Sequence, residues 1–421
     1  MSRLHPIRAA EARERLLAAS LRTPVVRLPL EEALGRRLSV PVVAGRAVPA
    51  LPRAAMDGFA VRSADLATAS SNQPAGLSCV ATVKAGAVPS VTLLPGEAVR
   101  IPTGGCVPLG ADAVVPLEST QGDGAEPTRV WVREPVPAGK NVVPAGLDFS
   151  PGEALFAPGR LLREAELAAL AALGKTEVEV HTAPRVRVLS SGAEVRPPGA
   201  DLGPAEVADS NQLWLWARSR TLGAEARQGG IVPDEPRALQ EALAAAVATS
   251  DMVLISAGTS VGEHDFTSTA LGALPGARLL FHGVRMRPGK PTLAALVERP
   301  EGACLVVGLP GFPGSAAVAF DVLVAPALAF MQGAPKGPVW GSGFSATLAA
   351  AYTSAVGRED YLRVRVVAGS EGLGGSVVVA SVAKGPSLVS GLLHTQGYVV
   401  VEEERERLDE GERVWVVTPP G

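Results

Sequence analysis

A hydrophobic run that leads into a turn of small residues constrains this chain more than any other segment. Residues 252–255 are apolar, residues 256–262 read SAGTSVG, and Asp265 stands where a helix is expected to begin. Such a turn is a common anion site, because glycine lets the backbone approach a ligand and the helix start presents free N–H groups. An ordinary strand-to-helix turn is the plain alternative. The candidate anion-binding residues of the turn are Gly258, Ser260 and Gly262.

A basic segment follows the next expected strand. Arg285, Arg287 and Lys290 surround Pro288-Gly289. Their positive charges suit the oxygens of a phosphate group. The turn and the basic segment together fit within one unit of the βαβ type. Each piece alone is more often a plain turn or a solvated arginine, but their combination favours a phosphorylated ligand.

Strands and helices alternate from residue 183 to residue 333. Expected strands lie at 185–189, 224–231, 252–255, 292–297 and 304–307. Expected helices lie at 210–222, 234–249 and 315–330, and Asp209-Ser210-Asn211 is expected to cap the first of them. This alternation predicts a mostly parallel sheet with helices on both faces, a three-layer α/β domain. Ligands of such sheets bind beyond the carboxyl ends of the strands. Residues that follow expected strands are Glu194, Pro310 and Gly311.

The flanking regions are rich in short strands. Residues 77–136 alternate apolar runs with Gly and Pro turns, and the same pattern returns after residue 333, which predicts a small C-terminal sheet or barrel. Amphipathic helices are expected at 7–20 and at 162–173, the latter closed by Gly174. We therefore expect a multidomain α/β plus β protein. Its domains would be 1–47 with 137–182, an inserted β-rich domain 48–136, the α/β domain 183–333 and a C-terminal β-barrel 334–421.

Three polar residues stand out in the N-terminal part. Asp57 precedes a glycine after a proline-rich lead-in, Thr103 precedes Gly104-Gly105, and Asp148 lies between apolar residues of a turn-rich segment. The Thr103 hydroxyl and the free N–H groups after it can bind an anion, and an ordinary loop is the equally good alternative for this segment. For Asp57 the residues alone favour a simpler interpretation, a hairpin turn whose Asp caps its own backbone.

Composition indicates a globular protein and argues against nucleic-acid binding. The 421 residues allow two to four domains, and 47% of them are hydrophobic, which permits sizeable cores. The 39 basic and 42 acidic residues give a formal net charge of -3, and aromatic residues make up only 4%. Neither a basic tract nor an aromatic platform is present, so we expect no nucleic-acid partner.

The cysteines and the apolar segments indicate a cytoplasmic protein. Cys79, Cys106 and Cys304 are far apart and lack metal-binding spacing, which fits reduced thiols. The N-terminal segment carries charges and no apolar core, so we expect no signal peptide. The longest apolar region, 306–331, contains three prolines and an aspartate and is a poor membrane span.

Nine segments, in order, resemble one family. They read AAMDGFAV, RIPTGGCVPLGADAVV, GKNVVPAGLDFSPGE, VLSSGAEV, ADSN, SAGTSVGEHDFT, RMRPGKPT, GLPGFPGSA and GREDYLRV, and they extend from about residue 48 to 365. This series is similar to the molybdopterin molybdenumtransferase family of the MoeA type, which is similar to the E domain of gephyrin.

The resemblance implies an activity, a cofactor and an assembly. Such enzymes take adenylylated molybdopterin and molybdate, cleave the phosphoanhydride, release AMP and deliver molybdenum cofactor, assisted by magnesium. It also implies a homodimer whose active site joins the α/β domain of one subunit to the N-terminal region of the other. A transient contact with the adenylyltransferase that makes the substrate would follow.

The resemblance also assigns roles to residues. The implied catalytic residues are Asp57, Thr103, Glu194, Asp234 and Asp265. The implied metal ligands are Asp57, Asp148, Glu194 and Asp265. The implied ligand-binding residues are Gly258, Ser260, Gly262, Arg287, Lys290, Pro310, Gly311, Arg358 and Ser387. The chain departs from the usual motifs at Ala54, Ala193, Ala257, Thr259 and Phe312.

Two other hypotheses compete with this one. The preceding adenylyltransferase resembles the α/β domain alone, and the β-rich flanks argue against it. A non-catalytic scaffold or cofactor carrier of the same fold is the second, and the presence of Asp57, Thr103, Glu194 and Asp265 argues against it.

Overall fold

The computed structural model describes residues 5–124, 126–257, 266–300, 302–367, 378–382 and 387–420. The chain forms two compact units, each with its own core. Unit 1 comprises Met1–Val40, Pro158–Glu164 and Glu177–Gly421, and unit 2 comprises Pro41–Ala157 and Ala165–Thr176. The predicted anion turn, with Gly258, Ser260, Gly262 and Asp265, lies outside the described residues. The four-domain division stays a prediction.

A six-stranded sheet forms the centre of unit 1. Its strand order is β16-β13-β17-β21-β20-β18, and the first four strands are parallel neighbours. They are β16 (Glu225–Val232), β13 (Arg185–Ser191), β17 (Met252–Ala257) and β21 (Gly302–Pro310). The antiparallel pairs at the other edge involve β20 (Leu293–Arg299) and β18 (Ala277–His282). The predicted mostly parallel sheet is confirmed.

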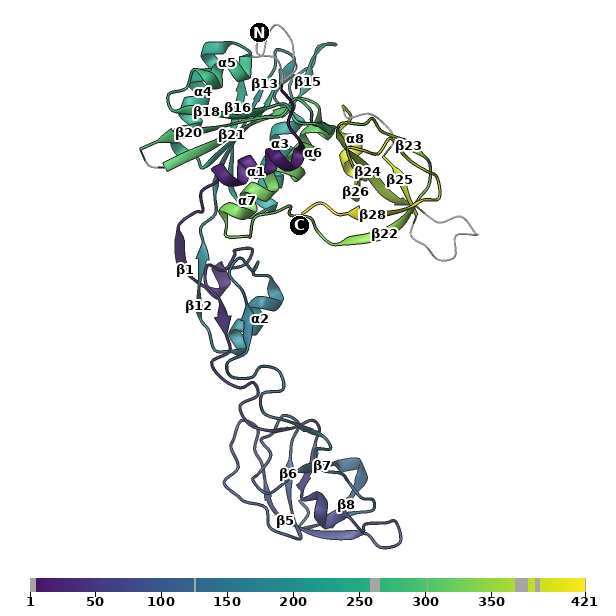
Figure 1. Ribbon diagram of the computed structural model, residues 1–421. Helices are drawn as coiled ribbons and strands as arrows, with labels where there is room; N and C mark the ends of the chain where they lie inside the picture. Colours follow the sequence, from purple (N-terminus) through teal and green to yellow (C-terminus); the bar gives the residue numbers. More distant parts are fainter. Residues whose placement is uncertain are drawn as a thin grey trace. The chain divides into compact units, whose positions relative to one another are not determined.

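Helices cover both faces of this sheet (Figure 1). One core cluster packs α4 (Pro236–Thr249) and α5 (Phe266–Gly272) on one face. The other cluster contains residues of α1 (Ala9–Ala19), α3 (Ser210–Thr221), α6 (Pro313–Ala319) and α7 (Ala325–Met331). Strands buried on both faces explain why β17 reads as one continuous apolar run. The three-layer prediction is therefore confirmed.

The helix after β21 is continuous but not uniform. A π-helical turn, η4 (Phe320–Val324), lies between α6 and α7. Among the described residues, this helix alone, Pro313–Met331, is long and apolar enough to cross a membrane, and 94% of its window is buried inside the protein. The apolar residues of this helix therefore pack in the core of unit 1.

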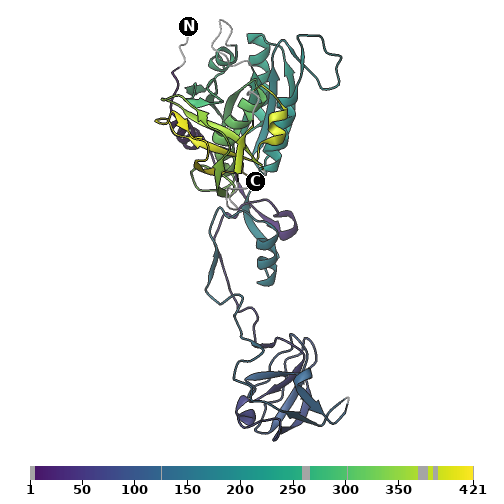
Figure 2. The ribbon, with the colours of Figure 1, turned by 90° about the vertical axis from the view of Figure 1, so that its right-hand side faces the viewer.

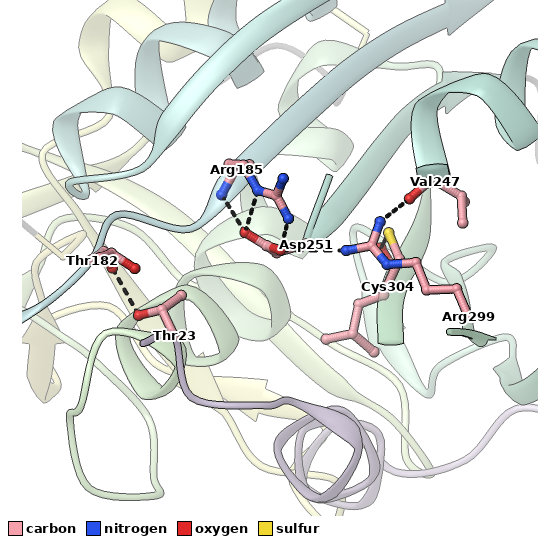
Figure 3. A network of polar contacts seen from close by, with 8 residues as sticks. Thr23, Thr182, Arg185, Val247, Asp251, Arg299 and Cys304 are labelled. Carbon is pink, nitrogen blue, oxygen red and sulfur yellow. Dashed lines mark hydrogen bonds and ion pairs between the residues drawn. The ribbon is translucent and has the colours of Figure 1, made fainter. Parts of the chain in front are cut away.

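An ion-pair network closes the amino edge of the sheet (Figure 3). Arg185, the first residue of β13, donates from its backbone N–H and its guanidinium to Asp251, which precedes β17. Arg299 lies 3.5 Å from the same carboxylate and also donates to the Val247 carbonyl. Burial raises the pKa of the neighbouring Cys304 thiol to about 12, so the thiol stays protonated. Ion pairs and hydrogen bonds of Asp251 with Arg185 and Arg299 therefore hold this edge together.

The C-terminal strands close into a barrel, as predicted. β24 (Glu359–Val367) pairs with both β25 (Val378–Ser381) and β26 (Gly397–Val401), and the circle is completed through β22 (Gly343–Leu348) and β28 (Arg413–Val417). Tyr361 and Tyr398 belong to the same core cluster as α6 and α7, so the barrel packs against these helices (Figure 2). A two-residue strand from the α/β region, β19 (Met286–Arg287), pairs in parallel with β24.

Unit 2 is built around a second six-stranded sheet, of order β7-β4-β6-β5-β9-β8. Phe59, Leu77 and Val115 are buried in its core, which confirms the β-rich prediction. Its strands are β4 (Gly58–Val61), β5 (Ala75–Thr82), β6 (Glu97–Ile101), β7 (Ala113–Pro116), β8 (Thr120–Gly122) and β9 (Arg129–Val132).

Short elements complete the fold. Helix α2 spans Glu164–Ala172, and Gly174 follows it at φ 78°, as predicted for its C-terminal cap. The remaining strands pair two by two: β1 (Val25–Pro29) with β12 (Glu177–His181), β2 (Val42–Val43) with β11 (Ala154–Phe156), β3 (Arg53–Ala54) with β10 (Val142–Val143), β14 (Val195–Arg196) with β15 (Val207–Ala208), and β23 (Tyr352–Thr353) with β27 (Arg407–Leu408). The short helices are η1 (Leu30–Glu32), η2 (Ser63–Leu66), η3 (Leu117–Ser119) and α8 (Ser390–His394).

Candidate active site

Unit 2 brings Asp57 and Thr103 into direct contact. Oδ1 of Asp57 accepts hydrogen bonds from the Thr103 backbone N–H at 2.6 Å and from its hydroxyl at 2.8 Å. These two bonds hold the pKa of Asp57 below its usual value, the backbone bond most of all. Asp57 therefore does not cap its own turn, and the simpler interpretation of this residue is wrong.

Local packing explains why these two residues meet. Asp57 lies between β3 and β4, and a Cβ on the next residue, Gly58, would collide with the Val115 carbonyl. Ala54 of β3 exchanges backbone hydrogen bonds with the loop after β6, accepting from the Gly104 N–H and donating to the Gly105 carbonyl. The glycine-rich loop thus lies against β3 and places Thr103 beside Asp57.

Asp148 lies on a third segment attached to the same region. Its backbone N–H donates to the Val48 carbonyl at 3.0 Å, while its carboxylate is exposed. Strand β10, which precedes it, pairs with β3. Three motifs that are far apart in the sequence therefore converge in unit 2, each with an exposed polar side chain.

Two predicted acids of unit 1, Glu194 and Asp234, lie at the carboxyl edge of the parallel strands. Glu194 follows β13 and Asp234 follows β16, and both side chains are exposed. The hydroxyl of Ser191, at the end of β13, lies 3.4 Å from the Asp234 carboxylate. This is the edge at which ligands of parallel sheets bind.

Asn211 joins two strand ends at this edge, and the sequence analysis missed it. Its Nδ2 donates to the Ser256 hydroxyl in β17 and to the Gly311 carbonyl after β21, both at 2.7 Å. The sequence analysis interpreted residues 209–211 as a helix cap and as part of the ADSN motif, and gave Asn211 no role of its own. The cap itself is real, because Asp209 accepts from the Gln212 N–H. The position of this cap beyond β13 was the signal that could have pointed to Asn211.

Two further groups at this edge face outward or lack a partner. The buried hydroxyl of Ser190 in β13 has no hydrogen-bond partner among the described residues. Phe312, one of the departures from the family motifs, follows Gly311 and is 58% exposed. An orphaned hydroxyl and an uncovered ring beside Pro310 and Gly311 are compatible with a ligand at this edge.

The basic segment meets the barrel through one buried carboxylate. Arg287 of β19 and Arg358, just before β24, both lie beside Asp360, at 3.9 Å and 3.0 Å respectively. Lys290 lies exposed in the adjoining turn, and Ser387 is exposed before α8. The structure thus joins Arg287 and Arg358, and Asp360 is a further residue that the sequence analysis did not single out.

The candidate side chains are of the type that binds a hard cation such as magnesium. Glu194, Asp234, Asp57 and Asp148 offer exposed carboxylate oxygens, which magnesium prefers. Within the described parts of the chain, however, no three His, Cys, Asp or Glu side chains gather to hold a metal. The first two acids belong to unit 1 and the other two to unit 2.

One cavity of unit 1 lies away from the predicted site. It measures about 640 Å³ and its walls include Arg36, Arg37, Arg220 and Glu225. Glu225 begins β16, so the cavity opens near the amino edge of the sheet. The predicted residues of unit 1 that the structure describes lie at the carboxyl edge of the sheet or by the barrel, away from this cavity.

Three family models match the chain in succession. They are the MoeA N-terminal region (domain I and II) at residues 7–174, a probable molybdopterin binding domain at 187–329, and the MoeA C-terminal region (domain IV) at 345–418. A molybdopterin molybdenumtransferase from Nostoc sp. is 38% identical over 72% of this chain and 69% of its own length. The chain belongs to the molybdopterin molybdenumtransferase family.

Other members of the molybdopterin molybdenumtransferase family match over more of the chain. Molybdopterin molybdenumtransferase 2 from Mycobacterium tuberculosis is 32% identical over 85% of this chain and 87% of its own. A crystal structure of the molybdopterin biosynthesis MoeA protein from Pyrococcus horikoshii is 31% identical, covers 99% of this chain and 100% of its own, and has a TM-score of 0.77. The family resemblance in the motifs thus extends to the whole fold.

Proposed function

We propose that this protein is a transferase of molybdenum cofactor biosynthesis that inserts molybdate into adenylylated molybdopterin and releases AMP. The observation that carries the proposal is the similarity, over most of the chain, to relatives named molybdopterin molybdenumtransferase. The site geometry supports it, because the predicted polar residues lie on turns and strand ends rather than in the cores.

The reaction asks the protein mainly to position charged groups. The substrate carries a phosphoanhydride and molybdate is itself an oxyanion, so both need N–H groups, hydroxyls and basic side chains. Arg287, Lys290 and Arg358 would neutralise these anions. Thr103 holds the Asp57 carboxylate in one orientation through two hydrogen bonds. Asn211 would fix the strand ends against which the substrate binds.

The proposed cofactor is magnesium. Its ligands would come from Asp57, Asp148, Glu194 and Asp265, whose oxygens suit a hard cation. A bound divalent cation would offset negative charge on the phosphoanhydride during its cleavage. Full AMP release after thorough chelation, with no metal retained by the protein, would contradict this part of the proposal.

The proposed assembly is a homodimer with composite sites. The candidate acids belong to two compact units, Asp57 to unit 2 and Glu194 to unit 1. A two-fold axis would give two equivalent sites, each built from unit 1 of one chain and unit 2 of the other. We also propose a cytoplasmic enzyme with reduced thiols, in transient contact with the adenylyltransferase that supplies its substrate.

Assaying AMP release from adenylylated molybdopterin with and without molybdate tests the function. The transferase releases AMP in response to molybdate. A scaffold or carrier of the same fold would bind the substrate without releasing AMP, and an adenylyltransferase would form the adenylylated compound from molybdopterin and ATP. Either of these two results would replace the proposal.

Subunit mixing tests the assembly. Asp57→Ala and Glu194→Ala homodimers should each be inactive. In a mixed dimer with composite sites, one site carries both lesions and the other is intact, so about half of the activity per dimer should return. Mixed dimers that stay inactive would show that each site is built within one chain.

A further inference from the structure

Asp360 is the most completely buried charged group beside the basic residues. Its side chain is 0% exposed, whereas those of Arg287 and Arg358 are 56% and 35% exposed. Oδ1 of Asp360 accepts from Nε of Arg358 at 3.0 Å. Oδ2 accepts from the Tyr352 hydroxyl at 2.9 Å and lies 3.9 Å from Nη1 of Arg287. Each carboxylate oxygen thus has its own partners.

The backbone also fixes this arrangement. Arg287 and Asp360 are register partners in the parallel pair β19–β24, and Arg285 accepts from the Glu359 N–H at 3.0 Å. Two arginines so close together repel each other, and long side chains of this kind have many rotamers when exposed. A buried carboxylate between them offsets the repulsion and restricts both side chains.

Tyr352 keeps the carboxylate itself in place. Burial first, and then the neighbouring Asp360, raise the pKa of Tyr352 to about 12, so the hydroxyl remains a donor at any pH at which the protein would work. The hydrogen bond from Tyr352 restricts rotation of the Asp360 carboxylate. Oδ1 of Asp360 then faces Arg358, and Oδ2 faces Arg287. The contact with Arg358 engages one of the five N–H donors of a guanidinium, so the others can serve a ligand.

We propose that Asp360 is a positioning residue, which holds Arg287 of the α/β region and Arg358 of the barrel side by side as one binding site for an oxyanion. The inference rests on the proposed function, because that function supplies the oxyanion. The ligand is either molybdate or a phosphate group of the adenylylated substrate. Both present tetrahedral oxygens to paired guanidinium groups, which are suited to such oxygens.

The test measures kcat and KM for each substrate in Asp360→Asn. This change keeps the shape of the side chain and removes its charge. A displacement of about 1 Å in a binding group can cost about a hundredfold. We therefore expect KM for one oxyanion substrate to rise by about tenfold to a hundredfold when the two arginines lose their positions. We expect kcat to change much less. The substrate whose KM rises identifies the anion bound here.

A double-mutant cycle separates positioning from a general structural role. If Asp360 acts by positioning both arginines, then Asp360→Asn should raise KM less in an Arg358→Ala background than in the parent, because only the placement of Arg287 remains to be lost. Equal effects of Asp360→Asn in both backgrounds would overturn the proposal, as would an unchanged KM for both substrates. A parent enzyme that releases no AMP would instead refute the proposed function, so the two failures are distinguishable.

A second variant covers the case in which Asp360→Asn does not fold. Tyr352→Phe preserves the ring and the Asp360 charge but removes the hydroxyl that holds Oδ2. We expect a smaller rise of the same KM, without loss of kcat. If Asp360→Asn does not fold, a Tyr352→Phe enzyme that keeps the parent's KM for both substrates would overturn the proposal.

Discussion

Thr103 donates both its backbone N–H and its hydroxyl to the same oxygen of Asp57, at 2.6 Å and 2.8 Å. The two residues are 46 positions apart in the sequence, and each comes from a motif that resembles the family's site. The contact leaves the other carboxylate oxygen of this exposed residue for a metal or a substrate.

The first prediction concerns this pair. Asp57→Ala should reduce molybdate-dependent AMP release by about a hundredfold, since losing one preorganised charged group commonly costs this much. Thr103→Val removes only the hydroxyl bond and should cost less, while Thr103→Ser should stay close to the parent. Circular dichroism should show intact folds. An Asp57→Ala enzyme with the parent's rate would remove Asp57 from the catalytic set.

The pKa of Asp57 adds a dependence on pH. The two bonds from Thr103 lower the pKa of Asp57. The stability that this contact contributes is therefore fully present above the usual pKa of 3.8 and is lost as the pH falls through the lower pKa of the folded protein. Asp57 should therefore be a carboxylate at every pH above about 4. An acid limb of the activity profile near neutrality that vanishes in Asp57→Asn would contradict this expectation.

The second prediction concerns Asn211. Asn211→Ala loses two hydrogen bonds that join strand ends, each contributing about 0.5–1.5 kcal/mol. Asn211→Asp should be worse than Asn211→Ala, because a carboxylate would face the Gly311 carbonyl, to which it cannot donate. AMP release and the free energy of unfolding measured for both variants check this order. A tolerated Asn211→Asp would show that the side chain does not hold these strand ends.

The third prediction concerns Phe312, which precedes α6 as its N-cap and makes no side-chain cap. Asparagine is a favourable N-cap residue, and alanine is not. Phe312→Asn should therefore be more stable than Phe312→Ala by about 0.5–2 kcal/mol. Urea unfolding followed by tryptophan fluorescence measures the difference. Equal stability of the two variants would show that an asparagine at this position does not cap the helix.

The fourth prediction concerns the three tyrosines of the chain. Burial raises the pKa of Tyr352 to about 12 and the pKa values of Tyr361 and Tyr398 well above the usual 10. An alkaline titration followed by tyrosinate absorbance should thus show no ionisation near pH 10 while the fold persists. A raised folded pKa adds stability that is present below pH 10 and is lost as the pH rises toward 12. A tyrosine that titrates reversibly at 10 in the folded protein would contradict the packing of the barrel.

Local signals in the sequence predicted local structure well. The glycine after α2 and the Asp209 cap of α3 were recognisable, because each acts on residues within one helical turn. The alternation of strands and helices predicted the α/β sheet for the same reason. The π-helical turn η4 was not recognisable, since its apolar sequence fits a regular helix equally well.

Contacts between distant residues could not be predicted. Asn211 and Gly311 are 100 positions apart, and neither motif contains a signal that the two residues are in contact. Asp360 stood in a quoted motif, but its role depends on the register of β19 against β24, which only the folded chain defines. Residue patterns and the family resemblance named the candidate residues, and the structure supplied the partners of those that it describes.

The central claim is that AMP release and molybdenum insertion are one reaction. The most direct test incubates the enzyme with adenylylated molybdopterin and molybdate and measures both AMP and molybdenum bound to the pterin over a single turnover. The account predicts equal amounts of the two products, with neither formed at an appreciable rate when molybdate is left out. AMP released without molybdenum insertion, or no AMP released at all, would contradict it.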